Sequence, residues 1–108
     1  MTRKLIQVID EIVELLSMCN WEEKADWFKA KRKILLKLNP EDAAFRRELV
    51  EIRSIIGGMG SFTDLPLYPP KGVGLTAQDA TNRQWDLAEQ LGQAIDELLD
   101  QNPSGLRE

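Results

Sequence analysis

The sequence predicts an all-α protein, a single four-helix, bundle-like domain with a long Gly/Pro-rich loop between the third and fourth helices. In four segments, apolar residues recur at steps of three and four, which is the helical period. Residues that favour helix starts and helix ends separate these segments. The chain has 108 residues, of which 43% are hydrophobic, and this suits one domain with one core.

The first two helices are expected over residues 3–18 and 21–38. The first has a broad apolar side made of Leu5, Ile6, Val8, Ile9, Ile12, Val13, Leu15 and Leu16. Asn20 is expected to cap the start of the second helix, because Asn is a favoured N-cap residue and Glu23 follows at capping-box spacing. The stem of Lys31 is expected to cover the apolar side of the second helix while its ammonium group reaches water.

The third helix is expected over residues 40–56. Asn39 is expected to cap it and Pro40 to occupy its first turn, where a proline needs no hydrogen-bond partner. Gly57 and Gly58 are expected to end it, because glycine readily adopts the backbone conformation that follows a helix.

Residues 57–75 hold five of the seven glycines and three of the five prolines. The segment is longer than most loops, but its apolar residues are expected to pin it to the core, so we predict a structured loop. The fourth helix is expected over residues 77–100, with Thr76 and Asp79 at capping-box spacing. Residues 101–108 are expected to fray.

Composition excludes several kinds of site. The chain has no histidine and one cysteine, Cys19, so it can build neither an intramolecular disulfide, nor a zinc site of nitrogen and sulfur ligands, nor a Ser-His-Asp centre. Cys19 is expected to be a small buried hydrophobe. We therefore expect no enzyme activity, no metal and no cofactor. No segment is apolar enough to span a membrane, and Asp10, Glu11 and Glu14 interrupt any signal-peptide core, so a cytoplasmic protein is expected.

Negative charge is concentrated in the fourth helix. The whole chain carries a net charge of −4, and residues 76–108 contain seven acidic and two basic residues. Five carboxylates on one side of this helix, with a tryptophan on its flank, are the candidate partner-binding residues: Asp79, Asp86, Glu89, Asp96, Glu97 and Trp85. The alternative is an ordinary solvated helix face. An acidic chain suits a basic partner better than it suits phosphates, so nucleic-acid binding is not expected.

Five basic residues cluster in the second helix, namely Lys29, Lys31, Arg32, Lys33 and Lys37. They could form a nucleic-acid patch. The alternative, which the negative whole-chain charge favours, is that they pair with acids on the first or fourth helix.

The segment Gly57 to Leu65, GGMGSFTDL, is glycine-rich but lacks the phosphate-binding GxxxxGKS/T pattern and follows no predicted strand. Its polar side chains are expected to form hydrogen bonds with backbone amides of the loop. Asp64 is expected to stabilise the loop in this way and not to act as an acid catalyst.

This segment, preceded by a helix ending in Ile55-Ile56 and by an earlier Trp-bearing helix, resembles a family of small uncharacterised bacterial proteins with a GGMGSxxDL signature. The similarity covers about residues 5–70. Its motif positions here are Gly57, Gly58, Gly60, Ser61 and Asp64. Some members look like immunity proteins of toxin systems, including contact-dependent growth inhibition.

The resemblance implies a non-enzymatic inhibitor that binds a cognate toxin, often a basic nuclease domain, and blocks its active site. Recognition in such systems is pair-specific, so the resemblance transfers no binding residues to this chain. The alternative from the sequence is a helical protein–protein interaction module or regulator unrelated to toxins.

Overall fold

The computed structural model describes residues 2–56 and 62–101. Within these ranges the chain is all-α, as predicted, and the four helices lie close to their expected ranges. They are α1 (Thr2–Met18), α2 (Glu22–Lys37), α3 (Ala43–Ser54) and α4 (Ala77–Gln101), with a short 3-10 helix, η1 (Phe62–Asp64), between α3 and α4.

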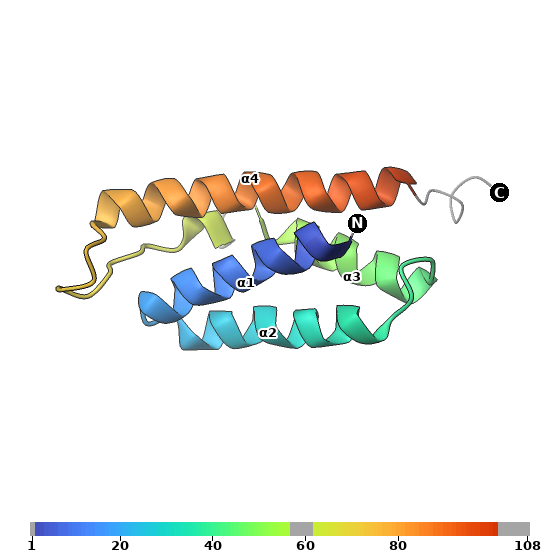
Figure 1. Cartoon of the computed structure of the whole chain (residues 1–108), viewed down its shortest axis with the longest axis horizontal. Helices are drawn as coiled ribbons and strands as arrows, with labels where there is room; N and C mark the ends of the chain where they lie inside the picture. Colours follow the sequence, from blue (N-terminus) through green and yellow to red (C-terminus); the bar gives the residue numbers. More distant parts are fainter. Residues whose placement is uncertain (1, 57–61, 102–108) are drawn as a thin grey trace.

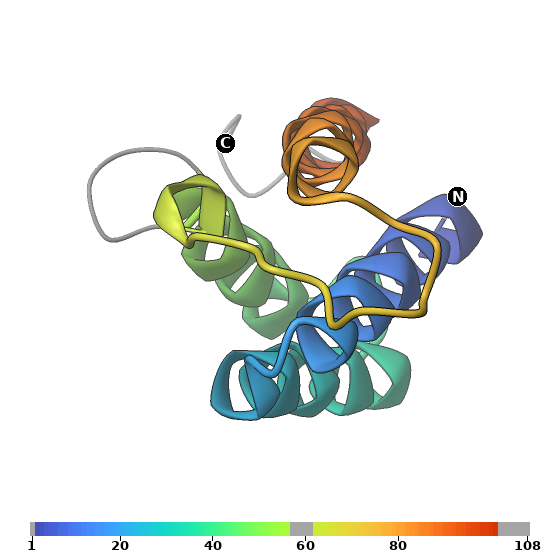
Figure 2. The same cartoon turned by 90° about the vertical axis from the view of Figure 1, so that its left-hand side faces the viewer.

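The helices pack around one core. Figure 1 shows α4 along one side of the molecule and α2 along the other, with α1 and α3 between them. The view along the bundle shows the four helices at separate corners (Figure 2). Helix α1 contacts both α2 and α4, while α3 packs against α4 and α2. Helices α3 and α4 are therefore neighbours in the bundle.

The predicted apolar faces form this core. Helix α1 buries Leu5, Val8, Ile9, Ile12, Leu15 and Leu16. Helix α4 buries Ala80, Leu87, Ala88, Leu91, Ala94 and Ile95. Cys19 is also buried, as expected, and is 6% exposed. Two polar contacts tie α4 to α1 at its surface, the Arg83–Glu11 ion pair and a hydrogen bond from Lys4 to Gln90.

The junction between α1 and α2 corrects one prediction. Asn20 does not cap α2; its backbone has a φ of 69°, and the residue at the N-cap position is Trp21. The Trp21 N–H donates to the Leu16 carbonyl and the Asn20 N–H to the Ser17 carbonyl. This is the Schellman arrangement, in which a residue in the left-handed region ends a helix. Asn20 therefore ends α1, because asparagine tolerates that conformation better than most residues.

Helix α3 begins at Ala43, three residues later than predicted, and its N-cap residue is Asp42. The Asn39 side chain accepts a hydrogen bond from the Glu41 N–H, and the Asp42 N–H donates to the Asn39 carbonyl. The first bond uses the Asn39 side chain for a turn before the helix, whereas that side chain was expected to cap the helix itself.

The end of α3 also differs from the prediction, because the helix stops at Ser54 and not at residue 56. The N–H groups of Ile55 and Ile56 each donate to the carbonyl three residues back, which tightens the last turn. Gly57 and Gly58, which were expected to end this helix, lie outside the described residues.

The described part of the long loop, residues 62–76, packs on the helices, with Phe62 and Leu67 buried in the core. The Trp21 indole N–H donates to the Pro66 carbonyl at 2.8 Å. The buried Gln84 amide on α4 donates to the carbonyls of Phe62 and Leu65 at 2.8 and 2.9 Å. The predicted capping box at the start of α4 is confirmed by reciprocal bonds between Thr76 and Asp79.

Candidate partner-binding groove between α3 and α4

A groove of about 760 Å³ lies between α3 and α4. Helix α4 supplies one wall through residues spaced three and four apart, which lie on one face of a helix. The lining residues are Arg53 and Ile56 from α3, Thr63 from η1, and Trp85, Asp86, Ala88, Glu89, Gly92, Gln93 and Asp96 from α4. We call this hollow the acidic groove.

The acidic groove holds three carboxylates against one guanidinium. Arg53 binds Asp96 through two contacts, from Nε to Oδ1 at 3.1 Å and from the terminal nitrogen to Oδ2 at 3.4 Å. Asp86 accepts a hydrogen bond from the Gln90 amide. Glu89 has neither a hydrogen bond nor an ion pair with any other residue that the structure describes. The groove therefore keeps a net negative charge that the described part of the chain does not neutralise.

Trp85 stands at the edge of the acidic groove with 59% of its surface exposed. It projects from the flank of α4, outside the apolar face, as the sequence predicts. Tryptophan combines a large apolar ring with one hydrogen-bond donor and is enriched at the energetic centres of protein interfaces. An exposed tryptophan beside carboxylates can contact an apolar group and a cation of the same partner.

The structure brings four of the six candidate residues of α4 into this groove: Trp85, Asp86, Glu89 and Asp96. The other two do not line it. Asp79 is engaged in the N-terminal capping box of α4, and Glu97 is exposed on α4 outside the groove.

Only part of the glycine-rich motif lies within the described residues. Gly57, Gly58, Gly60 and Ser61 lie outside the described residues. Asp64 ends η1 with an exposed side chain and does not line the acidic groove.

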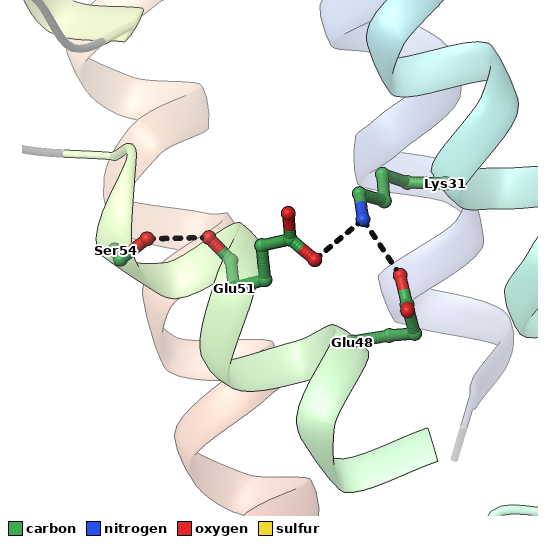
Figure 3. Close-up of polar contacts among 4 residues, drawn as sticks. All are labelled: Lys31, Glu48, Glu51 and Ser54. Carbon is green, nitrogen blue, oxygen red and sulfur yellow. Dashed lines mark hydrogen bonds and ion pairs between the residues drawn. The ribbon is translucent and has the colours of Figure 1, made fainter. Parts of the chain in front are cut away.

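Lys31 departs from its prediction, because its ammonium group is paired with two carboxylates of α3. The Lys31 side chain is 11% exposed, and its Nζ lies 2.8 Å from Glu48 and 2.6 Å from Glu51, both on α3 (Figure 3). The Trp27 ring lies below the same nitrogen, 5.2 Å away at its centroid. Burial acts to lower the pKa of Lys31, but the hydrogen bonds and charges of the two carboxylates outweigh burial and raise it above its ordinary value. Lys31 therefore remains an ammonium ion that joins α2 to α3.

The other basic residues of α2 are partly paired within the chain. Arg32 binds Asp10 of α1 at 2.6 Å, and Lys29 lies 3.7 Å from Asp26 of its own helix. The acids that pair with this cluster thus lie on α1, α2 and α3, whereas its partners were expected to be acids of α1 or α4. Lys33 is exposed.

Sequence reasoning missed Arg53 and Gln84. Arg53 was one of several basic residues in its segment, and nothing local indicates which acid it would face. Gln84 carried a usable signal, because it is a polar residue in the middle of the apolar face of α4, between Ala80 and Leu87. A polar group at such a position needs a buried hydrogen-bond partner.

Two kinds of feature are absent from the described residues. In the described ranges 2–56 and 62–101, no group of three or more His, Cys, Asp or Glu residues could hold a metal ion. No helix in these same ranges is both long enough and apolar enough to cross a membrane.

Burial raises the pKa of the Cys19 thiol, so the thiol keeps its proton at neutral pH.

Comparison with known proteins gives a family but no activity. No curated protein and no solved structure matches the sequence. Residues 19–76 match the domain of unknown function DUF6966, a range that spans α2, α3, η1 and the loop that leads to α4. Because this match covers more than half of the sequence, the chain belongs to the DUF6966 family.

Proposed function

We propose that this protein is a non-catalytic immunity protein that binds a basic protein toxin through the acidic groove and blocks the active site of that toxin. The observation that carries the proposal is the exposed Trp85 beside carboxylates that the described chain leaves unneutralised. The resemblance of the GGMGSxxDL segment to immunity-type proteins supports the choice of a toxin as partner.

The charges of the groove suit this role. A nuclease active site is basic because it binds phosphates, and carboxylates on an inhibitor can take the place of those phosphates. Glu89 has no described partner, so it can pair with a basic residue of the toxin without first breaking a contact within the chain. Complementary charge also raises the rate of association, and that increase falls with added salt.

Two potential nucleophiles have environments that favour a non-catalytic role. A lysine acts as a nucleophile only as a free amine, and Glu48 and Glu51 stabilise Lys31 as an ammonium ion. A cysteine attacks as a thiolate, and burial holds the Cys19 thiol in its protonated form. The proposal places the protein in the cytoplasm, where a free buried thiol is stable.

The test is co-expression with the toxin domain encoded beside the gene for this chain. We expect protection of growth and a complex that elutes as one species in gel filtration. Lack of protection together with separate elution would refute the proposal. If no toxin gene lies beside this one, an interaction module unrelated to toxins becomes the better explanation.

The groove is tested separately by Trp85→Ala, with Leu36→Ala as the matched control. Leu36 is 58% exposed on α2, a helix on the other side of the bundle from α4. Removing a hot-spot tryptophan from an interface costs about 2 kcal/mol or more, so Trp85→Ala is expected to weaken toxin binding roughly 30-fold. The control is expected to bind as the unchanged chain does. Equal affinities for all three proteins would exclude this groove as the binding surface.

A further inference from the structure

The loop between η1 and α4 carries a proline pattern that the proposed function does not use. Residues 65–71 read LPLYPPK, so two prolines three positions apart, Pro66 and Pro69, are followed by the basic residue Lys71. We call residues 66–71 the proline segment. Its first five residues belong to no helix, strand or turn. Figure 2 shows this part of the loop crossing the end of the bundle in front of α1, with no other element over it. The proline segment therefore forms part of the outer surface of the molecule.

The positions of the prolines favour the polyproline II conformation. A proline ring fixes its own φ at about −65°, and a residue that precedes a proline is pushed into the extended region. Pro66, Pro69 and Pro70 are restricted in the first way, and Tyr68 and Pro69 in the second. The N–H groups of Leu67 and Tyr68 donate no hydrogen bond to another residue that the structure describes. An extended backbone without internal hydrogen bonds is typical of polyproline II, which has about three residues per turn.

A period of three residues sorts the side chains of the proline segment onto three edges. The first edge carries Leu67 and Pro70, the second carries Tyr68 and Lys71, and the third carries Pro66 and Pro69. Leu67 is buried in the core and is 2% exposed, so the first edge begins against the bundle. Tyr68 is 72% exposed and Lys71 is also exposed, so the second edge faces outward. On the third edge Pro66 is exposed and Pro69 is half-buried. The second and third edges are therefore accessible to a partner.

The fold holds the start of the proline segment in place. The Pro66 carbonyl accepts a hydrogen bond from the Trp21 indole at 2.8 Å. The carbonyl of the preceding residue, Leu65, accepts one from the buried Gln84 amide at 2.9 Å. Together with the buried Leu67 side chain, these contacts order the segment before any partner binds. A segment that is already ordered loses less conformational entropy on binding.

We propose that the proline segment binds a partner domain whose groove is lined by aromatic side chains and ends in a carboxylate, as in SH3 domains. Such grooves accept a PxxP sequence in the polyproline II conformation. Pro66, Tyr68 and Pro69 lie between the aromatic rings of the partner. The ammonium group of Lys71 has no hydrogen bond or ion pair with any residue that the structure describes, so it is available to the carboxylate. The inference goes beyond the proposed function, because no residue of the proline segment lines the acidic groove.

The test compares Pro69→Ala with Pro70→Ala as the matched control. Both variants lose one proline ring, but Pro69 lies on an edge that contacts the partner and Pro70 on the edge that begins with the buried Leu67. The probe is a panel of purified SH3 domains that select a PxxP sequence followed by a basic residue. Each domain is titrated into the full chain by isothermal calorimetry, and circular dichroism confirms that each variant is folded.

We expect at least one domain of the panel to bind, and Pro69→Ala to weaken that binding on the order of 10-fold, which is the loss of one buried apolar group. Pro70→Ala is expected to leave the affinity within about threefold of that of the unchanged chain. Lys71→Gln is expected to weaken binding at low salt and to reduce the dependence of affinity on salt. If no domain binds with a Kd below about 1 mM, the inference is wrong. It is also wrong if Pro69→Ala has no effect, or if Pro70→Ala weakens binding as much as Pro69→Ala does.

A second measurement leaves the proline segment unchanged. Tyr68 is the only tyrosine of the chain, so labelling with 3-fluorotyrosine gives one fluorine resonance that needs no assignment. This resonance is expected to shift when the SH3 domain that binds is added without label. An unshifted resonance at saturation would overturn the inference, because the domain would then bind elsewhere on the chain. Trp85→Ala is expected to leave the affinity for the SH3 domain unchanged, so this result and the toxin-binding test are independent.

Discussion

Replacing Gln84 with methionine tests whether one buried amide holds the long loop onto α4. Gln84 is 2% exposed, and both hydrogens of its amide are used, one for the Phe62 carbonyl and one for the Leu65 carbonyl. Methionine has a similar length and shape but no donor, so the substitution removes both hydrogen bonds without opening a large cavity. The Phe62 carbonyl keeps one other bond, from the Leu65 N–H at 3.3 Å.

The expected loss follows from these contacts. Each lost hydrogen bond costs about 1 kcal/mol, and a carbonyl left without a partner adds about 1 kcal/mol more. Burial of the more apolar methionine side chain offsets part of this lost stability. We therefore expect Gln84→Met to lower the free energy of unfolding by about 2 kcal/mol, which corresponds to a fall in Tm of roughly 8 °C or more for a domain of this size.

Urea unfolding followed by circular dichroism and by tryptophan fluorescence measures this change. The control is Gln93→Met, an exposed position on the same helix, where a change within about 0.5 kcal/mol is expected. If Gln84→Met unfolds at the same urea concentration as the unchanged chain, the two hydrogen bonds do not hold the loop, and the reasoning fails.

Two further predictions concern stability. Gly92→Ala is expected to raise the free energy of unfolding by about 0.5–1 kcal/mol, because glycine is unfavourable inside a helix. The added Cβ would lie 3.7 Å from the Arg53 guanidinium, which is an ordinary van der Waals contact. A urea midpoint below that of the unchanged chain would contradict this prediction. Stability is also expected to fall at alkaline pH. The Cys19 thiol and the Lys31 ammonium group both have pKa values raised above their ordinary 9.0 and 10.5, so the unfolded chain loses these protons first as pH rises. Urea midpoints from pH 7 to 11 measure this fall, and Cys19→Ala should flatten the part that begins near pH 9.

The residues of the candidate site could be predicted from sequence only where the signal was local. The carboxylates and Trp85 are visible as a periodic pattern within α4, because a helix brings residues three and four apart onto one face. The pairing of Asp96 with Arg53 joins residues 43 positions apart, and no local pattern specifies it. The pocket lined by Trp27, Ser54 and Phe62 likewise combines α2, α3 and η1, so no pattern within a single segment predicts it.

The sequence by itself determined the helical class, the four apolar faces, the capping box at Thr76 and Asp79, and the concentration of acidic residues on α4. These features depend on the backbone and on neighbours within one or two turns, which the order of residues specifies directly. Only the tertiary structure decided that Lys31 is buried between two carboxylates of α3 and which acids of α4 line a groove. Each of these depends on how elements distant in the chain pack together, because packing determines which charges lose contact with water and which partners they meet.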